Sequence, residues 1–192
     1  MASYTMRVLA ETLKKIMSAK SLDTITVKEI VEDCGMNRKT FYYNFRGISD
    51  LLKWMLVTDI CAALNNNCKT DTWRTGFSSV MEYLVENKEM MQSICDSKYW
   101  PEVRMYLSKQ CDRSMTVFVE DTLQVYEKKQ NQIVNISDTN MKYIIRSYSM
   151  LKFSLMEEWF LSGMKESIDE FLTMFAKLLN NNLYTVFRLL NE

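Results

Sequence analysis

Apolar residues recur along this chain with the 3.6-residue period of amphipathic α-helices, and no useful stretch alternates apolar and polar residues as a half-buried strand does. Near the start of the chain, for example, Leu9, Leu13 and Met17 fall on one helical face. Only one proline and four glycines interrupt the 192 residues, so long helices are favoured. The sequence therefore predicts an all-α protein.

About nine helices are expected, separated by short polar or glycine-containing segments. Their approximate ranges are 4–19, 27–33, 38–44, 50–64, 71–87, 89–95, 100–129, 141–161 and 165–190. Thr26 and Glu29 have the spacing of a capping box at the start of the second helix. Gly35 suits a left-handed helix end, and Asn37 is a good N-cap for the third helix. Ser49, or the residue before it, is expected to cap the fourth.

The first three helices have the organisation of a helix-turn-helix unit, in which a supporting helix precedes two short helices joined by a tight turn. Such a unit places its second short helix in the DNA major groove. Segment 36–46 suits this role, because it is rich in positive and hydrogen-bonding side chains while no Asp or Glu occurs between Cys34 and Ser49. Its candidate DNA contacts are Asn37, Arg38, Lys39, Thr40, Tyr42, Tyr43, Asn44 and Arg46. Phe41 and Phe45 are expected to point inward.

Residues 4–56 resemble the DNA-binding domain of the TetR family of transcriptional regulators. The matching segments are Thr26-Val-Lys-Glu-Ile-Val, the turn Cys34-Gly-Met, the recognition helix Thr40-Phe-Tyr-Tyr-Asn-Phe, and Asp50-Leu-Leu at the start of the linking helix. The rest of the chain fits the family in length and helical character. It also looks similar to a subgroup that includes activators of dihydroxyacetone kinase operons.

The resemblance implies roles for individual side chains. Those expected to contact phosphates or sugar edges are Thr26, Lys28, Tyr42, Tyr43 and Asn44, and those expected to face the groove are Arg38, Lys39 and Thr40. In the alternative interpretation, one tyrosine of the pair packs against the supporting helix instead. The family often has a phosphate-binding lysine where this chain has Ile48. Either Arg46 takes its place or the affinity for DNA is lower.

Charge is distributed unevenly, although the 24 Lys and Arg balance the 24 Asp and Glu. Residues 1–55 contain nine Lys and Arg against six Asp and Glu, and residues 56–192 contain 15 against 18. The neutral total therefore does not argue against DNA binding. We expect a helix-turn-helix DNA-binding domain at 1–47 and a helical regulatory and dimerisation domain at 48–192.

Several classes of catalytic and metal site are excluded by composition. The chain has no histidine, so a Ser-His-Asp triad, a Cys-His pair and a histidine metal ligand are all impossible. No phosphate-binding glycine motif and no CxxC pair occurs, and we expect neither a metal nor a cofactor. A small all-helical enzyme is the distant alternative, but neighbouring acids such as Glu157 and Glu158 diverge on a helix. We therefore expect no enzymatic activity.

The cellular location is expected to be the cytoplasm. The five cysteines suggest buried, reduced thiols, and residues 1–20 lack the apolar core of a secretory signal. The longest apolar stretch contains Lys53 and Asp59, so no membrane span is expected.

Methionine and aromatic residues are frequent in the C-terminal part, where they would line an effector pocket or fill an ordinary core. The candidate pocket residues are Trp100, Tyr106, Phe118, Tyr126, Tyr148 and Phe153. The effector is expected to be a small molecule, with a protein partner as the alternative.

The last two helices carry more apolar surface than one partner helix needs, which predicts a four-helix bundle across the two-fold axis of a homodimer. Burial within one subunit is the alternative. The candidate interface residues are Tyr148, Leu151, Leu155, Trp159, Phe171, Phe175, Leu178 and Leu179. A dimer would read a palindromic operator in double-stranded DNA with two recognition helices.

Overall fold

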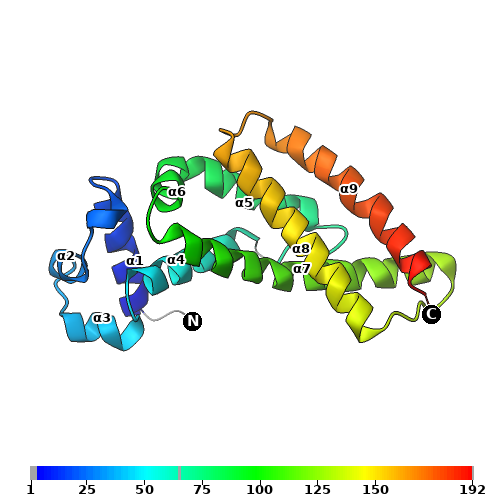
Figure 1. Ribbon diagram of the computed structural model, residues 1–192, viewed down its shortest axis with the longest axis horizontal. Coiled ribbons are helices and arrows are strands. Elements are labelled where there is room, and N and C mark those ends of the chain that lie inside the picture. Colours follow the sequence, from blue (N-terminus) through cyan, green and yellow to red (C-terminus); the bar gives the residue numbers. More distant parts are fainter. Residues whose placement is uncertain (1–3, 65, 192) are drawn as a thin grey trace. The chain divides into compact units, whose positions relative to one another are not determined.

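The computed structural model describes residues 4–64 and 66–191, except for the side chains of residues 179–181. These residues form nine α-helices, one short 3₁₀ helix and no strand, which confirms the predicted all-α fold (Figure 1). The elements are α1 (Tyr4–Met17), η1 (Leu22–Thr24), α2 (Val27–Asp33), α3 (Arg38–Asn44), α4 (Ile48–Leu64), α5 (Trp73–Glu86), α6 (Lys88–Cys95), α7 (Trp100–Gln130), α8 (Asp138–Leu161) and α9 (Ile168–Leu189).

Three predicted helix starts are wrong for local reasons. Helix α8 begins at Asp138 rather than 141, because the Ser137 hydroxyl caps it and accepts a hydrogen bond from the Asn140 amide at 3.3 Å. Helix α9 begins at Ile168 rather than 165, because the Ser167 hydroxyl accepts a hydrogen bond from the Glu170 amide at 3.2 Å and the Glu170 carboxylate accepts one from the Ser167 amide at 2.9 Å. Helix α4 already begins at Ile48, so Ser49 lies inside its first turn and is not its cap. The Ser49 hydroxyl donates to Glu102 instead.

The chain divides into two compact units. Unit 1 comprises Met1–Ala62 and Tyr83–Leu107, and unit 2 comprises Ala63–Glu82 and Ser108–Glu192. Unit 1 therefore contains α1 to α3, most of α4, α6 and the start of α7. Unit 2 contains most of α5, the rest of α7, and helices α8 and α9.

The core of unit 1 lies beneath the three N-terminal helices. Leu9 and Leu13 of α1, Ile30 of α2 and Phe41 of α3 are fully buried, and α4 adds Leu51 and its neighbours. Burial of each such side chain contributes about 1.5–3 kcal/mol. Because α2 and α3 are only seven residues long, this packing holds them in place more than helix propensity does.

The core of unit 2 is dominated by aromatic rings. The Trp73 ring of α5 packs on Phe118 of α7 at 6.2 Å and on Phe175 of α9 at 6.1 Å between centroids. Phe171 stacks on Phe175 at 6.1 Å and contacts Trp159 of α8 at 5.9 Å. These rings join helices α8 and α9, which lie side by side and run in opposite directions (Figure 1).

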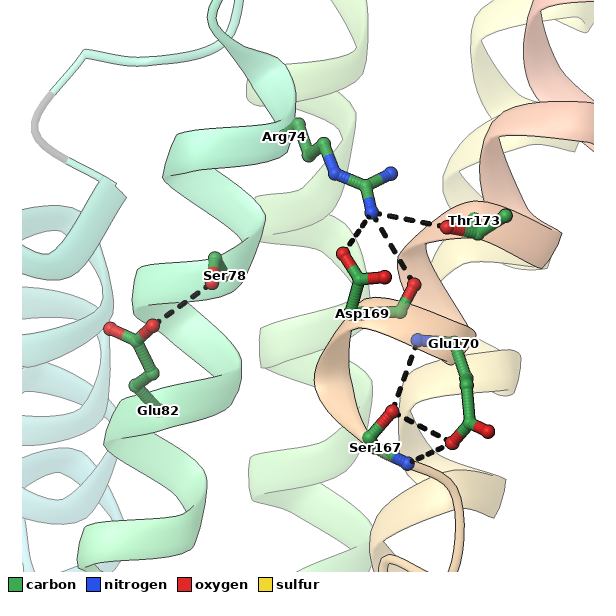
Figure 2. A network of polar contacts seen from close by, with 7 residues as sticks. All are labelled: Arg74, Ser78, Glu82, Ser167, Asp169, Glu170 and Thr173. Carbon is green, nitrogen blue, oxygen red and sulfur yellow. Dashed lines mark hydrogen bonds and ion pairs between the residues drawn. The ribbon is translucent and has the colours of Figure 1, made fainter.

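A polar network joins α5 to the start of α9 on the surface of unit 2 (Figure 2). A guanidinium nitrogen of Arg74 lies 2.6 Å from the Asp169 carboxylate and donates to the Thr173 hydroxyl at 3.1 Å. Asp169 is largely exposed, so this ion pair contributes no more than about 1 kcal/mol. Helices α5 and α9 are already packed together by the aromatic core, and the network adds polar contacts between them at the surface.

Candidate nucleic-acid interface

The first helix of the motif, α2, begins at the predicted capping box. The Glu29 amide donates to the Thr26 hydroxyl at 3.3 Å, and the Thr26 amide donates to the Glu29 carboxylate at 2.9 Å. A hydrogen bond from Lys20 is the largest cause that lowers the pKa of Glu29 to about 2, so this carboxylate stays ionised at neutral pH. Thr26 and Lys28 are both exposed at this end of α2, and Lys28 lies 3.8 Å from Glu32.

The turn between α2 and α3 is a Schellman motif. Gly35 has the predicted left-handed conformation, with φ of +67°. The Gly35 amide donates to the carbonyl of Glu32 at 3.3 Å and the Met36 amide donates to that of Val31 at 2.8 Å. This turn ends α2 sharply and directs the chain into the recognition helix.

Recognition helix α3 begins at Arg38 and is capped by Asn37, as predicted. The Asn37 side-chain oxygen accepts a hydrogen bond from the Thr40 amide at 2.9 Å and one from the Thr40 hydroxyl at 3.2 Å. Asn44 donates to the Thr40 carbonyl at 2.9 Å near the other end of the helix. These three polar side chains therefore have local roles in stabilising α3.

The two faces of α3 differ strongly in burial. Phe41 and Phe45 are buried as expected, and the Phe45 ring packs against Trp54 of α4 at 5.9 Å. Tyr42 is 57% exposed while its ring contacts Phe41 edge-on, whereas Tyr43 is 90% exposed. Both tyrosine side chains thus face largely into solvent.

The positive side chains of α3 itself have no neighbouring acid as a partner among the described residues, whereas Arg46, just after the helix, lies close enough to Asp50 for their charges to interact. Arg38, Lys39 and Arg46 are exposed, and none of them belongs to an ion pair among the described residues. Ile48 is buried, so it contributes apolar packing at the position where the family often has a lysine. One short segment thus carries five of the exposed candidate side chains, namely Arg38, Lys39, Tyr42, Tyr43 and Arg46. Two further candidates, Thr26 and Lys28, lie at the start of the neighbouring helix α2.

The sequence did not reveal a polar cluster that lies next to the exit of the recognition helix. Asp50 and Lys53 of α4 and Glu102 of α7 form consecutive ion pairs of 2.7 Å and 2.8 Å. The spacing of Asp50 and Lys53 was visible in the sequence. Glu102 lies about fifty residues further along the chain, so only the fold reveals its contact.

Two family comparisons cover most of the chain. Residues 9–55 match the family described as "Bacterial regulatory proteins, tetR family". Residues 71–181, more than half of the chain, match the family described as "Transcriptional regulator C-terminal region". The chain belongs to the TetR family. It is a transcriptional regulator whose helix-turn-helix is the DNA-binding element of that family.

A curated relative of this TetR-family chain is the HTH-type dhaKLM operon transcriptional activator DhaS of Lactococcus lactis subsp. lactis (strain IL1403). The two sequences are 28% identical over 90 residues, which cover 47% of this chain and 48% of the relative. The chain thus matches about half the length of that relative. The solved structure of a dihydroxyacetone kinase operon activator DhaS is similar over 98% of this chain and 99% of that one. Its TM-score of 0.65 at 19% identity demonstrates a common fold.

Within the described part of this TetR-family regulator, no helix has the length and apolar character needed to cross a membrane. The same residues contain no group of three acidic or cysteine side chains arranged to hold a metal ion. No disulfide joins its five cysteines. Cys61 is exposed, so its expected burial is wrong, whereas the other four are half-buried and burial raises the pKa of the Cys111 thiol.

The six candidate effector residues are divided between the two units. Trp100 and Tyr106 belong to unit 1, whereas the other four belong to unit 2. Phe118 is buried against Trp73, while Tyr126 packs on Tyr184 at 5.1 Å in another ring cluster. The remaining two, Tyr148 and Phe153, are half-buried on α8.

The candidate interface residues divide into buried and exposed sets. Trp159, Phe171 and Phe175 are buried in the aromatic core of unit 2. Leu151 is exposed. Tyr148, Leu155 and Leu178 are half-buried, and the side chain of Leu179 lies outside the described residues.

A buried lysine is a further feature that the sequence did not indicate. Lys152 of α8 is only 5% exposed, and its amine donates to the Ser114 hydroxyl at 2.7 Å. The same nitrogen lies 4.1 Å from the centre of the Phe77 ring. Removal from water lowers the pKa of Lys152, and no carboxylate among the described residues pairs with it. Lys152 is therefore a buried amine that contacts one hydroxyl and one aromatic ring, with Cys68 and Cys111 nearby.

Proposed function

We propose that this TetR-family regulator binds a palindromic operator as a homodimer, with residues 1–47 as its DNA-binding domain and 48–192 as its regulatory and dimerisation domain. The observation that supports operator contact most strongly is the exposed, acid-free outer face of α3. Arg38 and Lys39 on this face, together with Arg46 just after the helix, have no ion-pair partner among the described residues and match the negative charge of a DNA groove.

In this proposal the side chains of α3 have different roles. Arg38 and Lys39 lie in the first turn, the part of a recognition helix that meets base edges. Tyr43 lies one helical turn after Lys39, and Tyr42 one turn after Arg38, so both hydroxyls would contact phosphates or sugar edges. Arg46 follows the helix and would bind the backbone as it leaves the groove.

The remaining candidates would contact DNA with the atoms that their local hydrogen bonds leave available. For Asn37 this is the side-chain NH₂ group, and for Asn44 it is the side-chain oxygen. Thr40 would contribute its hydroxyl oxygen as an acceptor. Thr26 and Lys28 at the start of α2 would bind a phosphate on the neighbouring strand.

The proposed dimer forms through the exposed apolar faces of α8 and α9. On α8, Tyr143, Met150 and Leu161 are exposed at intervals close to whole helical turns, and Leu151 adjoins Met150. Met174 and Leu189 are the exposed apolar side chains described on α9. Two helices from each subunit would bury these residues in a four-helix bundle, while Trp159 and Phe171 stiffen each helix pair from within.

The effector acts through the C-terminal helices by favouring one spacing of the two recognition helices. A small molecule is the first candidate. A protein partner is the second. Because the curated relative is named an operon activator, we propose that this chain also activates transcription.

Selection of DNA duplexes from a random pool tests this proposal. The full-length protein is expected to enrich an inverted repeat whose half-sites are centred about one helical turn apart, or a multiple of it. The Lys39→Ala variant should enrich that repeat poorly, whereas Lys142→Ala, which removes an exposed lysine of α8, should leave enrichment unchanged. Failure of the wild-type protein to enrich any sequence contradicts the proposal.

A further inference from the structure

A short segment of unit 1 holds the chain on both sides of the helix-turn-helix. This segment, residues 98–102, lies at the start of α7. The Lys98 amide donates to the Asp23 carboxylate at 3.0 Å, and the Lys98 amine donates to the Asp23 carbonyl at 2.9 Å. Asp23 lies in η1, just before α2, so these bonds hold the entry to the motif.

The other side of the motif is held through Glu102. Its carboxylate accepts hydrogen bonds from the Lys53 amine at 2.8 Å and from the Ser49 hydroxyl. Lys53 also pairs with Asp50 at 2.7 Å, and Asp50 accepts a hydrogen bond from the Arg46 amide at 3.2 Å. Arg46 follows directly after recognition helix α3 and its C-cap. A continuous chain of contacts therefore joins Glu102 to the exit of the recognition helix.

Lys53 has the burial and partners of a structural residue and not of a phosphate contact. Its side chain is only 16% exposed and lies between two carboxylates. The Lys53 hydrogen bond lowers the pKa of Glu102, so that carboxylate remains ionised at neutral pH. The amine of Lys53 is thus occupied by protein oxygens, whereas the amine of Lys39 is not.

We propose that Glu102 is a positioning residue for DNA binding, which fixes the exit of recognition helix α3 by holding Ser49 and Lys53 of α4. This inference rests on the proposed operator binding and adds to it a residue outside the helix-turn-helix. Lys98, at the other end of the same segment, fixes the entry through Asp23. Segment 98–102 therefore sets the orientation in which α2 and α3 are presented to DNA.

The sign of the effect distinguishes positioning from simple electrostatics. Glu102 is an acid in the same compact unit as the recognition helix. Removing an acid makes the charge of the unit more positive, so electrostatics alone predicts that the Glu102→Gln variant binds DNA more tightly. Loss of the positioning contacts predicts weaker binding. The two explanations thus predict opposite results for one substitution.

Fluorescence anisotropy with a duplex from the DNA upstream of the protein's own gene measures this effect. Glu102→Gln is expected to raise the Kd about threefold, within the range of a partly exposed ion pair. The slope of log K against log salt should stay unchanged, because no phosphate contact is lost. Glu86→Gln is the matched control, since Glu86 is an exposed acid of unit 1 without an ion pair among the described residues. It should bind as tightly as wild type or slightly more tightly.

Two further variants test whether the contacts act together. Ser49→Ala should raise the Kd in the same direction, and the Ser49→Ala/Glu102→Gln pair should bind no more weakly than Glu102→Gln alone. Additive losses, or Glu102→Gln binding as tightly as wild type, would overturn the inference. Circular dichroism melting of each variant identifies losses that come from unfolding.

A measurement without DNA keeps the inference testable if the duplex is not bound. Hydrogen exchange followed by mass spectrometry should show faster exchange in the peptide containing Arg46 in Glu102→Gln but not in Glu86→Gln, because the Arg46 amide is held by Asp50. Unchanged exchange there contradicts the positioning role, whatever the DNA result. If exchange changes while wild type fails to bind any duplex, the proposed function fails and the contact chain stands.

Discussion

Replacing Lys152 with methionine should make the protein more stable at neutral pH. The amine of Lys152 is buried without a carboxylate partner among the described residues. The Ser114 hydroxyl, the Phe77 ring and the nearby Cys68 and Cys111 compensate only in part for its lost hydration. Methionine has a similar length and keeps the apolar contacts of the lysine stem. The Lys152→Met variant therefore loses two modest favourable contacts, but it also avoids the larger free-energy cost of burying a charged amine.

The magnitude follows from how the folded protein can avoid that cost. The folded protein can avoid burying a charge by releasing the proton of Lys152. At a pH below the ordinary pKa of 10.5, releasing this proton costs about 1.4 kcal/mol for each pH unit of difference. That cost is the upper limit of the desolvation penalty. At a pH three units lower the penalty is thus at most about 4 kcal/mol. The hydrogen bond to Ser114 contributes about 1 kcal/mol and the Phe77 ring about 1–2 kcal/mol in the opposite direction. Because 4 kcal/mol is an upper limit, a net gain of up to about 1–2 kcal/mol is expected for Lys152→Met.

The gain should depend on pH in a defined direction. The pKa of Lys152 is lowered in the folded protein, so the unfolded chain binds more protons between this lowered pKa and 10.5. The free energy of unfolding of the wild-type protein therefore rises with pH through that window, because its slope with pH is proportional to the protons bound by the unfolded state minus those bound by the folded state. Methionine has no such dependence. The advantage of Lys152→Met should shrink as the pH approaches 10.5.

Urea unfolding at several pH values between neutral and about 10, at one protein concentration, measures this difference. Lys142→Met is the matched control, because Lys142 lies exposed on the same helix and should change stability by less than about 0.5 kcal/mol. If Lys152→Met were less stable than wild type at every pH, or if its advantage did not vary with pH, the argument from the buried amine would be refuted.

Three other substitutions test the recognition helix and the proposed dimer. Asn37→Ala removes the cap of α3 and should lower the free energy of unfolding by about 1 kcal/mol in urea; an unchanged midpoint would contradict the cap's role. Gly35→Ala forces a Cβ into the left-handed region and should lower stability by about 1 kcal/mol, which a wild-type melting curve would disprove. Met150→Lys places a charge on the exposed face of α8, so light scattering should find a mass near the 22.7 kDa of one chain; a persistent dimer would place the interface elsewhere.

The helix-turn-helix was predictable because its signals are local. The capping box at Thr26 and Glu29, the left-handed Gly35 and the Asn37 cap each involve residues only a few positions apart. Such signals fix helix ends before any tertiary contact is known. The start of α9 carried the same kind of signal in Ser167 and Glu170, and weighing it would have corrected the predicted start at 165.

The C-terminal helices were harder to predict because their important contacts join distant residues. The apolar face of α8 could be seen in the sequence, but whether Trp159 meets Phe171 of its own chain or a second subunit depends on three-dimensional packing. The burial of Lys152 depends on Ser114 and Phe77, which lie far away in the sequence. Periodicity identifies an apolar face without identifying the element that covers it.

The most direct test of the central claim is the salt dependence of operator binding by wild-type protein and the Lys39→Ala variant. For the wild type, log K should fall linearly and steeply with log salt, because cations of α3 displace counterions from DNA phosphates. Lys39→Ala should weaken binding and, where Lys39 meets a phosphate, make this slope about one unit shallower while its melting temperature stays near that of wild type. Wild-type binding that does not respond to salt, or a Lys39→Ala variant with unchanged affinity and slope, would contradict recognition of DNA through α3.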